Sequence, residues 1–324
     1  MNLIEVTSKF PDELSATKHF EQARWGDTPT CAYCGSEKLS RRKKDHRFTC
    51  LKCNKSFSVT VNTMLHKTRI PLRRWLIAFS LVTDAKKGVP AKQLQRNLGV
   101  SYKTAWRMGM KMRKLMYDPA QKLDDVVEMD ETYVGGKPRK GGYPNFTKKD
   151  KAYYDRAITQ LEAEDFDISE GKRKKPWVPK GMGHKTIADR KTPVVGMVER
   201  DGNVIAKVMK TISAKKLKAM VEKNIDEEDS VLITDNHKGY NKMNRIIDHI
   251  KVDHQKMYSY RGINTNTIES FWAIIKRGIM GQYHKVSVKY LPDYIAEFVF
   301  KYNNRNKDDM FETLVTNAMK QKQN

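Results

Sequence analysis

The spacing of apolar residues predicts a helical segment over residues 67–119. Apolar side chains recur there every three or four positions, which is the period of one face of an α-helix. Gly88 and Gly99 interrupt the pattern, so we expect three helices separated near these glycines. The positions that carry the period are Leu72, Trp75, Leu76, Phe79, Leu94, Leu98, Ala105, Met108, Met112 and Leu115.

After Pro119 the pattern changes to short apolar runs that are typical of β-strands. The first three runs (VVEMDETYVGG, TPVVGMVERDG and NVIAKVMK) include the hairpin signal Asp201-Gly202 and favour an antiparallel meander. The later runs SVLITDN and HIKVDH alternate with helix-like stretches, which favours parallel strands beside the meander. We expect a mixed sheet within residues 120–324, with helices after the third, fourth and fifth runs.

A long segment rich in Lys, Gly and Pro separates the first two runs, over about residues 137–191. Long segments of this composition are either functional loops or solvated excursions without a role. The basic cluster Lys172, Arg173, Lys174 and Lys175, next to a tryptophan, favours contact with a phosphate backbone. We therefore predict a basic, DNA-facing insertion after the first strand.

All four cysteines of the chain lie between residues 31 and 53. They form two C-x-x-C pairs with 15 residues between the pairs, which is the spacing of a four-cysteine zinc ribbon. A redox-active pair is the alternative, but it needs a thioredoxin-like context that the flanking sequence lacks. We predict that residues 1–66 form an N-terminal helix and a ribbon around one structural Zn²⁺ ion, bound by Cys31, Cys34, Cys50 and Cys53.

The chain is strongly basic over its whole length, and its 324 residues suffice for two or three domains. It has 62 lysine and arginine residues against 38 aspartate and glutamate residues, a formal net charge of +24. That excess indicates a polyanionic partner, most often nucleic acid, although a generally solvated surface is the alternative. The sequence has neither an 18-residue apolar run nor a signal-peptide pattern, so we expect no membrane partner and a cytoplasmic, nucleoid-associated location.

The segment VPAKQLQRNLGVSYKTAWRMGMKMRKLM has the outline of a helix-turn-helix. A short helix is followed by a turn at Gly99, an N-cap candidate at Ser101, and a longer basic helix. In such a unit the first turns of the second helix face base edges, which would place Tyr102, Lys103 and Arg107 in the major groove. Three-helix units also occur without DNA, and the net charge and the ribbon favour a DNA-binding domain over residues 67–119.

Three acidic residues stand where separate elements can bring them together. Asp130 lies within a strand-like run, Asp235 ends another, and Glu269 opens the helical stretch TIESFWAIIKRGI. Carboxylates at strand ends can bind two divalent cations a few ångströms apart, which promotes in-line phosphoryl transfer. Two Mg²⁺ ions are expected, with Mn²⁺ as a substitute. For any single acid, a surface residue or a partner of Lys or Arg is the alternative, so the order strand, strand, helix carries the inference.

With these features together, the sequence resembles a known family, the DDE transposases of bacterial insertion sequences that carry an N-terminal zinc ribbon. The matching blocks follow the family's order over nearly the whole chain: WGDTPTCAYCGS, CLKCNKSFSVTVNTMLHKTRIPLRRW, LGVSYKTAWRM, VVEMDETYVGGK, VLITDNHKGY, INTNTIESFWAIIKRGIMGQYHKVS and EFVFKYNNR. The family's catalytic acids correspond to Asp130, Asp235 and Glu269. One departure is Asn264, where the family has histidine, which would alter a DNA contact but not the metal ligands.

The resemblance implies an RNase H-like catalytic domain over residues 120–324, in a transposase that binds terminal inverted repeats. Cleavage by water would free a 3′-hydroxyl, which then attacks target DNA at the same two-metal site. The resemblance also implies a homodimer or higher oligomer on double-stranded DNA, because both element ends are handled together.

The sequence predicts a role in the site for some of the residues close to the three acids and not for others. Lys276 lies two helical turns after Glu269 on the same face, and the resemblance implies that it joins the catalytic group and contacts DNA, with Arg277 beside it. A solvated helix residue is the alternative. Glu131 should point to the opposite side of the strand from Asp130, whereas Glu128 shares its face but has nothing else to single it out.

Two other functions are compatible with parts of this pattern. A DNA-binding regulator descended from a transposase would keep the ribbon and the helices, but it would need none of the three acids. A metal-dependent nuclease would keep the acids and would hydrolyse DNA without joining it.

Overall fold

The computed structural model describes residues 1–42, 45–117, 122–135, 191–252, 262–307 and 310–321, together with five residues between 152 and 159. The chain divides into a unit formed by Met1–Tyr133 with Pro193–Asn324 and a unit formed by Val134–Thr192. The second unit is the predicted insertion. Its basic cluster Lys172, Arg173, Lys174 and Lys175 lies outside the described residues, and everything below concerns the first unit.

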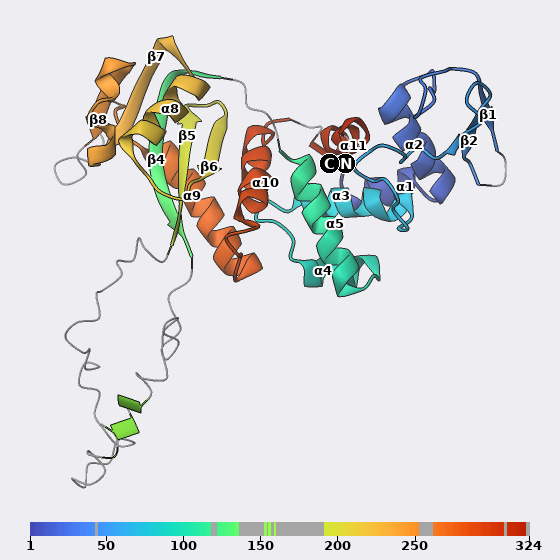
Figure 1. The fold of residues 1–324 in the computed structure, drawn as a ribbon, viewed down its shortest axis with the longest axis horizontal. Helices are drawn as coiled ribbons and strands as arrows, with labels where there is room; N and C mark the ends of the chain where they lie inside the picture. Colours follow the sequence, from blue (N-terminus) through green and yellow to red (C-terminus); the bar gives the residue numbers. More distant parts are fainter. Residues whose placement is uncertain are drawn as a thin grey trace. The chain divides into compact units, whose positions relative to one another are not determined.

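The N-terminal residues form two helices where the sequence predicted one: α1 (Leu3–Lys9) and α2 (Glu13–Trp25) (Figure 1). Each helix begins with a capping box, in which the side chain of Asn2 or Asp12 accepts a backbone N–H three residues on. Asp12 starts a new helix directly after Pro11, which explains why the segment is divided.

Three short strands carry the cysteine segment: β1 (Leu39–Arg41), β2 (Phe48–Cys50) and β3 (Ser56–Phe57). They form an antiparallel sheet in the order β1-β2-β3. Phe48 and Phe57 are buried in a small core together with Cys31 and Cys50. So small a core needs a further constraint to be stable, and a metal ion is the usual one.

The three predicted helices are α3 (Leu72–Asp84), α4 (Ala91–Leu98) and α5 (Tyr102–Leu115). Gly99 ends α4 in the left-handed conformation, with φ +60°, where a residue without a Cβ atom is favoured. Ser101 then caps α5, because its hydroxyl accepts the backbone N–H of Thr104 at 3.2 Å. The predicted turn and cap are confirmed.

The helices α1 to α5 share one apolar core with the last helix of the chain, α11 (Met310–Lys320). Phe20, Phe79, Met108 and Phe311 are all fully or almost fully buried in it. Figure 1 shows α11 beside these helices, and it contacts α2, α3 and α5. The range 120–324, predicted as one catalytic domain, therefore ends in a helix that packs with the N-terminal helices, because its apolar face completes their core.

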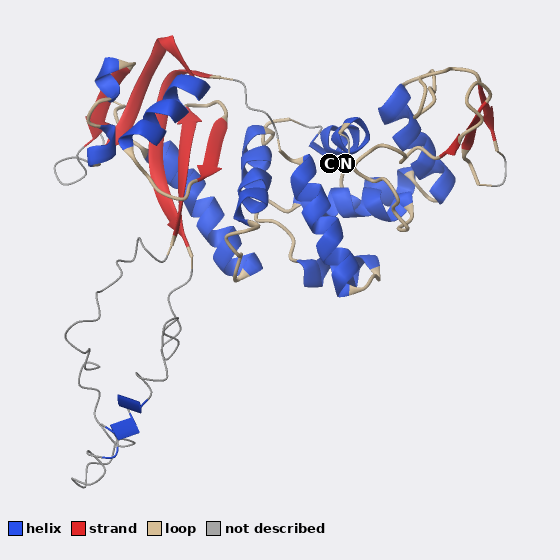
Figure 2. Cartoon of the chain, in the orientation of Figure 1, coloured by secondary structure: helices blue, strands red, loops and turns tan. Residues whose placement is uncertain are grey.

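Within the part of the chain that the structure describes, the larger sheet has five strands: β4 (Leu123–Val134), β5 (Thr192–Glu199), β6 (Val204–Val208), β7 (Ile225–Asp235) and β8 (Asp248–Val252) (Figure 2). Their order is β6-β5-β4-β7-β8. β5 and β6 are antiparallel, whereas β4 and β7, and β7 and β8, are parallel. The mixed sheet, with later strands added in parallel beside the first three, is confirmed.

The described helices that accompany the sheet are α8 (Ala214–Asn224), α9 (Asn266–Gly278) and α10 (Leu291–Asn303). A single π-helical turn, η3 (Ile279–Tyr283), continues α9. No helix of the described residues is long and apolar enough to cross a membrane.

The helical stretch predicted after the fourth run does not form an α-helix. Two short 3₁₀ turns, η1 (Lys238–Tyr240) and η2 (Met243–Arg245), follow β7 instead. Asp235 accepts the backbone N–H of His237, and the imidazole of His237 accepts that of Gly239. Such local bonds from side chain to backbone compete with helix formation.

Candidate active site and metal centre

Two of the predicted acids lie on neighbouring parallel strands at the same level. Met129 of β4 pairs with Thr234 of β7. The next residue is Asp130 on β4 and Asp235 on β7. β7 ends at Asp235, so this pair lies at the carboxyl end of that strand, where a ligand has access. The prediction that strand context brings these two acids together agrees with this register.

The Asp130 carboxyl group has a perturbed environment. Burial raises its pKa from 3.8 to about 7, and the negative charges of Glu131 and Asp235 add to this effect. The indole N–H of Trp272, on α9, donates to Asp130 Oδ2 at 3.0 Å. A partly buried acid crowded by other carboxylates is stabilised in its charged form by a cation, and such groups gather at functional sites.

Helix α9 brings the third acid and the lysine to the same place. Asp130, Glu269, Trp272 and Lys276 line one pocket of about 360 Å³ with three of their neighbours. Lys276 is exposed and lies two turns after Glu269 on the same face of α9, as the sequence predicted. Arg277 is also exposed but does not line this pocket.

The carboxylates are spread more widely than the ligands of one ion. Among the described residues, only the four cysteines bring three or more potential ligand atoms within 4.8 Å of one another. Asp235 adjoins Asp130 through the strand register and does not line the pocket with Glu269. Two cations about 3.5–4 Å apart require a wider set of ligands than a single ion does, and oxygen ligands are those that Mg²⁺ prefers.

Glu128 is the residue that sequence reasoning missed. Its side chain is fully buried and accepts the backbone N–H groups of Thr267 at 2.9 Å and Ile268 at 3.0 Å. Arg200 Nε also donates to it, at 2.9 Å. A carboxylate from β4 therefore caps the N-terminus of α9, where backbone N–H groups lack partners within the helix. This bond fixes the first turn of α9, which carries Glu269.

The sequence gives little sign of this contact, because the partners of Glu128 lie 72 to 140 positions away along the chain. The one available signal is an acidic residue between the apolar residues of a buried strand. Such a residue needs a partner, but the pattern alone does not say which one.

Glu128→Gln is expected to lower the free energy of unfolding by about 2 kcal/mol, because a charged acceptor of two backbone N–H groups and a guanidinium becomes neutral. Hydrogen exchange of the Thr267 and Ile268 amides should become faster, and this is the measurement that separates loosening of α9 from general damage. Glu222→Gln, on the exposed side of α8, is the matched control. Unchanged exchange at both amides would contradict the proposed cap.

Glu131 borders the same pocket as Asp130, although it was expected on the opposite side of the strand. Its carboxylate is already engaged, since the Tyr240 O–H donates to Glu131 Oε2 at 2.6 Å. Tyr240 is fully buried, and burial together with the charge of Glu131 raises the pKa of its hydroxyl. This bond ties β4 to the turn that follows Asp235.

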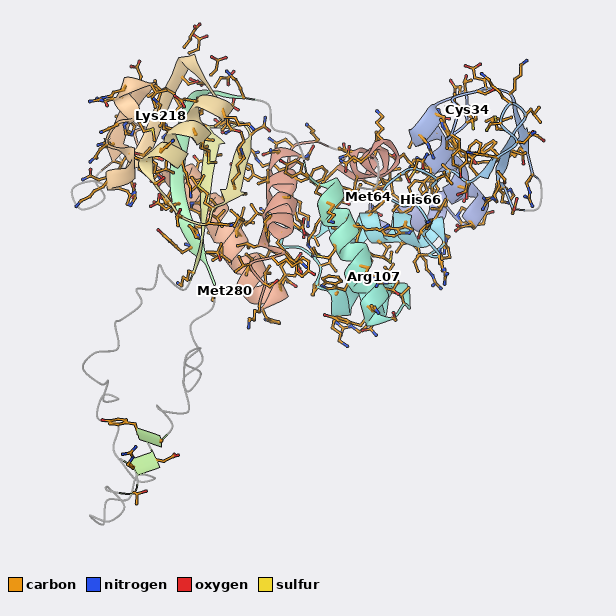
Figure 3. The ribbon with its side chains drawn as sticks, in the orientation of Figure 1. Cys34, Met64, His66, Arg107, Lys218 and Met280 are labelled. Atoms are coloured by element: carbon orange, nitrogen blue, oxygen red, sulfur yellow. The ribbon has the colours of Figure 1, made fainter. Side chains whose placement is uncertain are left out.

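The residues predicted to read DNA lie on one side of α5. Tyr102, Lys103 and Arg107 are exposed, whereas Ala105 and Met108 are buried in the core; Figure 3 labels Arg107. The helix thus has the two faces that the sequence predicted, one for packing and one left in solvent.

The four cysteines form a site of the size that zinc requires. Cys31 Sγ and Cys53 Sγ are 3.7 Å apart, and Cys34 Sγ and Cys50 Sγ are 3.6 Å apart. Four sulfur atoms about 2.3 Å from a tetrahedral zinc ion are separated by about 3.8 Å, whereas a disulfide requires about 2.05 Å. The donor set therefore fits Zn²⁺ and excludes disulfides.

Two equivalent turns present these sulfur atoms. The N–H of Gly35 donates to the carbonyl of Cys31, and the N–H of Asn54 donates to that of Cys50, both at 2.9 Å. Gly35 has φ +72° and Asn54 has φ +53°, a left-handed conformation that glycine and asparagine adopt most readily. The same turn after each cysteine pair explains the matching C-x-x-C-G and C-x-x-C-N segments.

Removal of zinc is expected to unfold the ribbon, because a core this small depends on its metal. Elemental analysis should give one zinc ion per chain, and Cys50→Ser should reduce this to less than half. Limited proteolysis should then cut within residues 31–57 while α3 to α5 stay protected. Cys→Ser substitution with unchanged zinc content would show that the metal is held elsewhere.

A family model described as the ISXO2-like transposase domain matches residues 122–303, and one described as a transposase zinc-ribbon domain matches residues 11–56. A Halobacterium salinarum protein, described as an uncharacterized protein in transposable element ISH50, is 28% identical over 128 residues. That alignment takes in 39% of this chain and 43% of the relative, so the chain spans less than half of that relative's length.

Solved structures give weaker likenesses. A chain of the simian T-cell lymphotropic virus intasome, in complex with PP2A regulatory subunit B56 gamma, aligns at a TM-score of 0.29 with 10% identity, over 64% of this chain and 63% of that one. The Mos1 strand transfer complex aligns at 0.28 with 11% identity, over 74% and 73%. A pre-cleavage Mos1 transpososome aligns at 0.26 with 11% identity, over 74% and 78%.

Proposed function

The chain belongs to the ISXO2-like transposase family, and we propose that it binds the terminal inverted repeats of an insertion sequence and catalyses metal-dependent cleavage and transfer of DNA strands. One observation carries the chemical part of this proposal. Asp130 and Asp235 are neighbours on parallel strands, and α9 brings Glu269 and Lys276 to the pocket that Asp130 lines.

In the proposed mechanism Asp130, Asp235 and Glu269 would hold two divalent ions, with Mg²⁺ as the expected metal. When bound, these ions would lower the pKa of the attacking hydroxyl and offset charge on the phosphate. Trp272 fixes one oxygen of Asp130, and Glu128 fixes the helix turn that carries Glu269. Lys276 would place the phosphodiester by contacting a non-bridging oxygen.

Zinc has a separate, structural role in this proposal. Four thiolates close its coordination shell and leave no position for water or substrate. The ribbon then serves binding, together with a helix-turn-helix formed by α4 and α5, in which Tyr102, Lys103 and Arg107 contact bases. Arg277 and the cluster Lys172 to Lys175 are proposed as further backbone contacts, and a homodimer or larger assembly would hold both DNA ends.

The decisive experiment is incubation of the protein with Mg²⁺, labelled element ends and a target plasmid. The ends are identified as inverted repeats in the DNA that flanks the gene. Cut and joined products support the transposase. Cutting without joining would establish the nuclease instead, and end binding without cutting would establish the regulator. Samples with chelator or with scrambled ends serve as controls and should give no product.

A further inference from the structure

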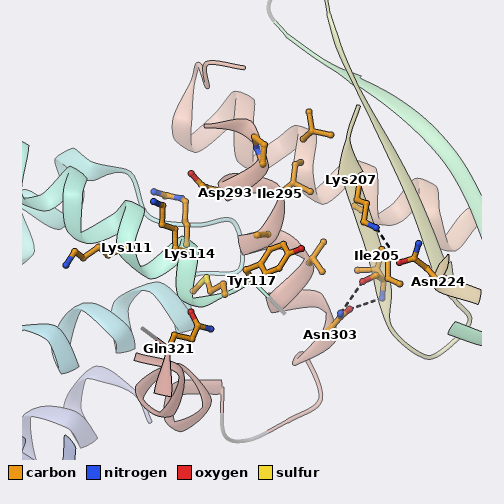
Figure 4. A pocket seen from close by; sticks show the side chains of 18 of the residues that line it. Lys111, Lys114, Tyr117, Ile205, Lys207, Asn224, Asp293, Ile295, Asn303 and Gln321 are labelled. Carbon is orange, nitrogen blue, oxygen red and sulfur yellow. Dashed lines mark hydrogen bonds between the residues drawn. The ribbon is translucent and has the colours of Figure 1, made fainter. Parts of the chain in front are cut away.

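A groove of about 1080 Å³ lies between α5 on one side and β6 and the end of α8 on the other, with α10 between these two walls (Figure 4). Four lysines from three elements line it: Lys111 and Lys114 on α5, Lys207 on β6, and Lys223 on α8. Small-molecule pockets hold about 300–1,000 Å³. The groove is at the upper limit of that range, and Lys114 and Lys223 are exposed to solvent, so it suits a segment of a polymer.

The charge of this groove is not balanced from within. Asp293 is the one acidic residue among the described residues that line it. Arg113 is paired with the buried Glu297, with 2.8 Å between Arg113 Nε and Glu297 Oε2, and it shares that carboxylate with Lys301. The four lysines less Asp293 leave a formal excess of three positive charges. Among the described residues none of these lysines forms an ion pair. Lys111 and Lys207 donate to neutral oxygens instead, on Met64 and Asn224.

The lysines also repel one another in pairs. Burial and the charge of Lys114 lower the pKa of Lys111, and burial and the charge of Lys223 lower the pKa of Lys207. Partly buried like charges that lower each other's pKa destabilise the free protein, and an anion between them removes that cost. Because the two pairs come from opposite walls, an anionic partner would contact both walls.

Helix α5 connects this groove to the predicted base-reading residues. Lys103, Arg107, Lys111 and Lys114 follow one another at spacings of four, four and three residues, which places them on one face of the helix. The stripe begins at the exposed N-terminal turns and ends in the groove. A nucleic acid that follows the stripe from Arg107 is therefore led to Lys207 and Lys223.

We propose that this groove, formed by Lys111, Lys114, Lys207 and Lys223, binds a stretch of sugar–phosphate backbone of the DNA duplex that α5 contacts. This inference rests on the proposed function for the identity of the polyanion. Tyr117, at the rim of the groove and 67% exposed, is placed to donate its hydroxyl to a phosphate oxygen. The groove would thus hold the duplex on both the helical part and the sheet.

The test compares two double variants that each remove two positive charges. Lys207→Gln with Lys223→Gln removes the two lysines that β6 and α8 contribute to the groove. Lys215→Gln with Lys218→Gln instead removes exposed lysines of α8 that do not line it (Figure 3 labels Lys218). Affinity for a duplex that carries the element end is measured by fluorescence anisotropy in chelator, across a series of salt concentrations. Thermal unfolding of both variants shows whether the fold is intact.

Each phosphate contact contributes about 0.9 to the slope of log affinity against log salt. The groove variant should therefore lose about 1.8 of that slope and bind about tenfold more weakly, while the control changes less than twofold. Equal effects of the two variants would overturn the proposal, as would stronger binding of an acidic peptide than of the duplex. A photo-reactive phenylalanine analogue in place of Tyr117 should cross-link to the duplex, and failure to do so would also contradict it.

These results do not depend on cleavage. If the groove variant binds like the control while the wild type cuts and joins DNA, the groove proposal fails and the function stands. If the wild type binds through the groove but produces no cut DNA, the function fails and the groove stands as a site of a DNA-binding protein.

Discussion

Asp235→Asn is expected to lose DNA cleavage by on the order of 10³-fold or more, since a metal ion contributes several kcal/mol to stabilisation of the transition state. Asp130→Asn should lose as much. In both variants the fold should persist, because an asparagine oxygen can still accept the N–H of His237 at residue 235, or the indole N–H of Trp272 at residue 130. Loss of activity would therefore report loss of charge and not loss of structure.

The measurement is the rate of nicking of a labelled element end in Mg²⁺, with the thermal unfolding temperature determined for each variant. Glu222→Gln removes an acidic charge from exposed α8 and should keep full activity. Nicking by Asp235→Asn at the wild-type rate would exclude this residue from the site. Equilibrium binding of the DNA end should change little in these variants, because the proposed contacts with the duplex are made by lysines and arginines.

Asp130 also makes the stability of the metal-free protein depend on pH, and the fold becomes less stable as the pH rises. Its pKa in the folded protein, about 7, is above its ordinary value of 3.8, so ionisation destabilises the fold between those values and reaches its full cost above pH 7. Without divalent metal, Asp130→Asn should therefore unfold at a higher temperature than the wild type at pH 8 and at a similar temperature at pH 4. Added Mg²⁺ should stabilise only the wild type. An equal effect of Mg²⁺ on both proteins would mean that Asp130 does not bind it.

Local patterns were sufficient to predict most of the elements but not the contacts between them. The cysteine spacing, the turn at Gly99 and the cap at Ser101 depend on neighbours a few residues apart, and all are present. The mixed sheet followed from the order of the apolar runs. The register that pairs Met129 with Thr234 did not, because it joins strands that lie far apart along the chain.

The contacts that hold the site together have no such local signal. Glu128 meets α9 across 139 positions, and Trp272 meets Asp130 across 142. Gly196 shows the same limitation, because a Cβ atom there would lie 2.5 Å from the Trp272 ring, yet the sequence presents only a glycine in a strand. Long-range packing decides which polar residue of a strand becomes a ligand, a cap or an anchor.

The packing of α11 with the N-terminal helices was also beyond the sequence. An apolar stripe shows that a helix has a buried face, but any complementary face can cover it. The core that Phe311 shares with Phe20 and Phe79 joins residues almost 300 positions apart, so only the assembled fold shows it.

The largest loss of stability is expected at a residue outside the active site, Glu297. Its fully buried carboxylate accepts from Arg113 Nε at 2.8 Å, from Lys301 Nζ at 2.6 Å and from the Tyr283 O–H at 2.9 Å. Burial by itself would raise the pKa of Glu297, but the charges of Lys301 and Arg113 outweigh it and hold the pKa at about 2. The group therefore stays ionised throughout the usable pH range.

Glu297→Ala should lower the free energy of unfolding by about 3–5 kcal/mol, because two buried cations lose their common partner. Arg113 belongs to α5 and Tyr283 ends the π-helical turn after α9, so the damage should reach both the predicted DNA-reading helix and the helix that carries Glu269. Glu222→Ala, which breaks the exposed pair with Lys218, should cost less than about 1 kcal/mol.

Replacing the whole cluster shows whether Glu297→Ala loses stability because of unpaired charge or because of lost packing. If unpaired charge is the cause, the combination of Glu297→Leu, Arg113→Met and Lys301→Met should recover most of the stability that Glu297→Ala loses, since apolar replacement of a buried ionic group is often neutral. Urea denaturation of the three proteins measures this directly. A triple variant as unstable as Glu297→Ala would show instead that the shape of the cluster is needed. The features that no apolar side chain replaces are then the Tyr283 hydroxyl and the close approach of Gly88 to it.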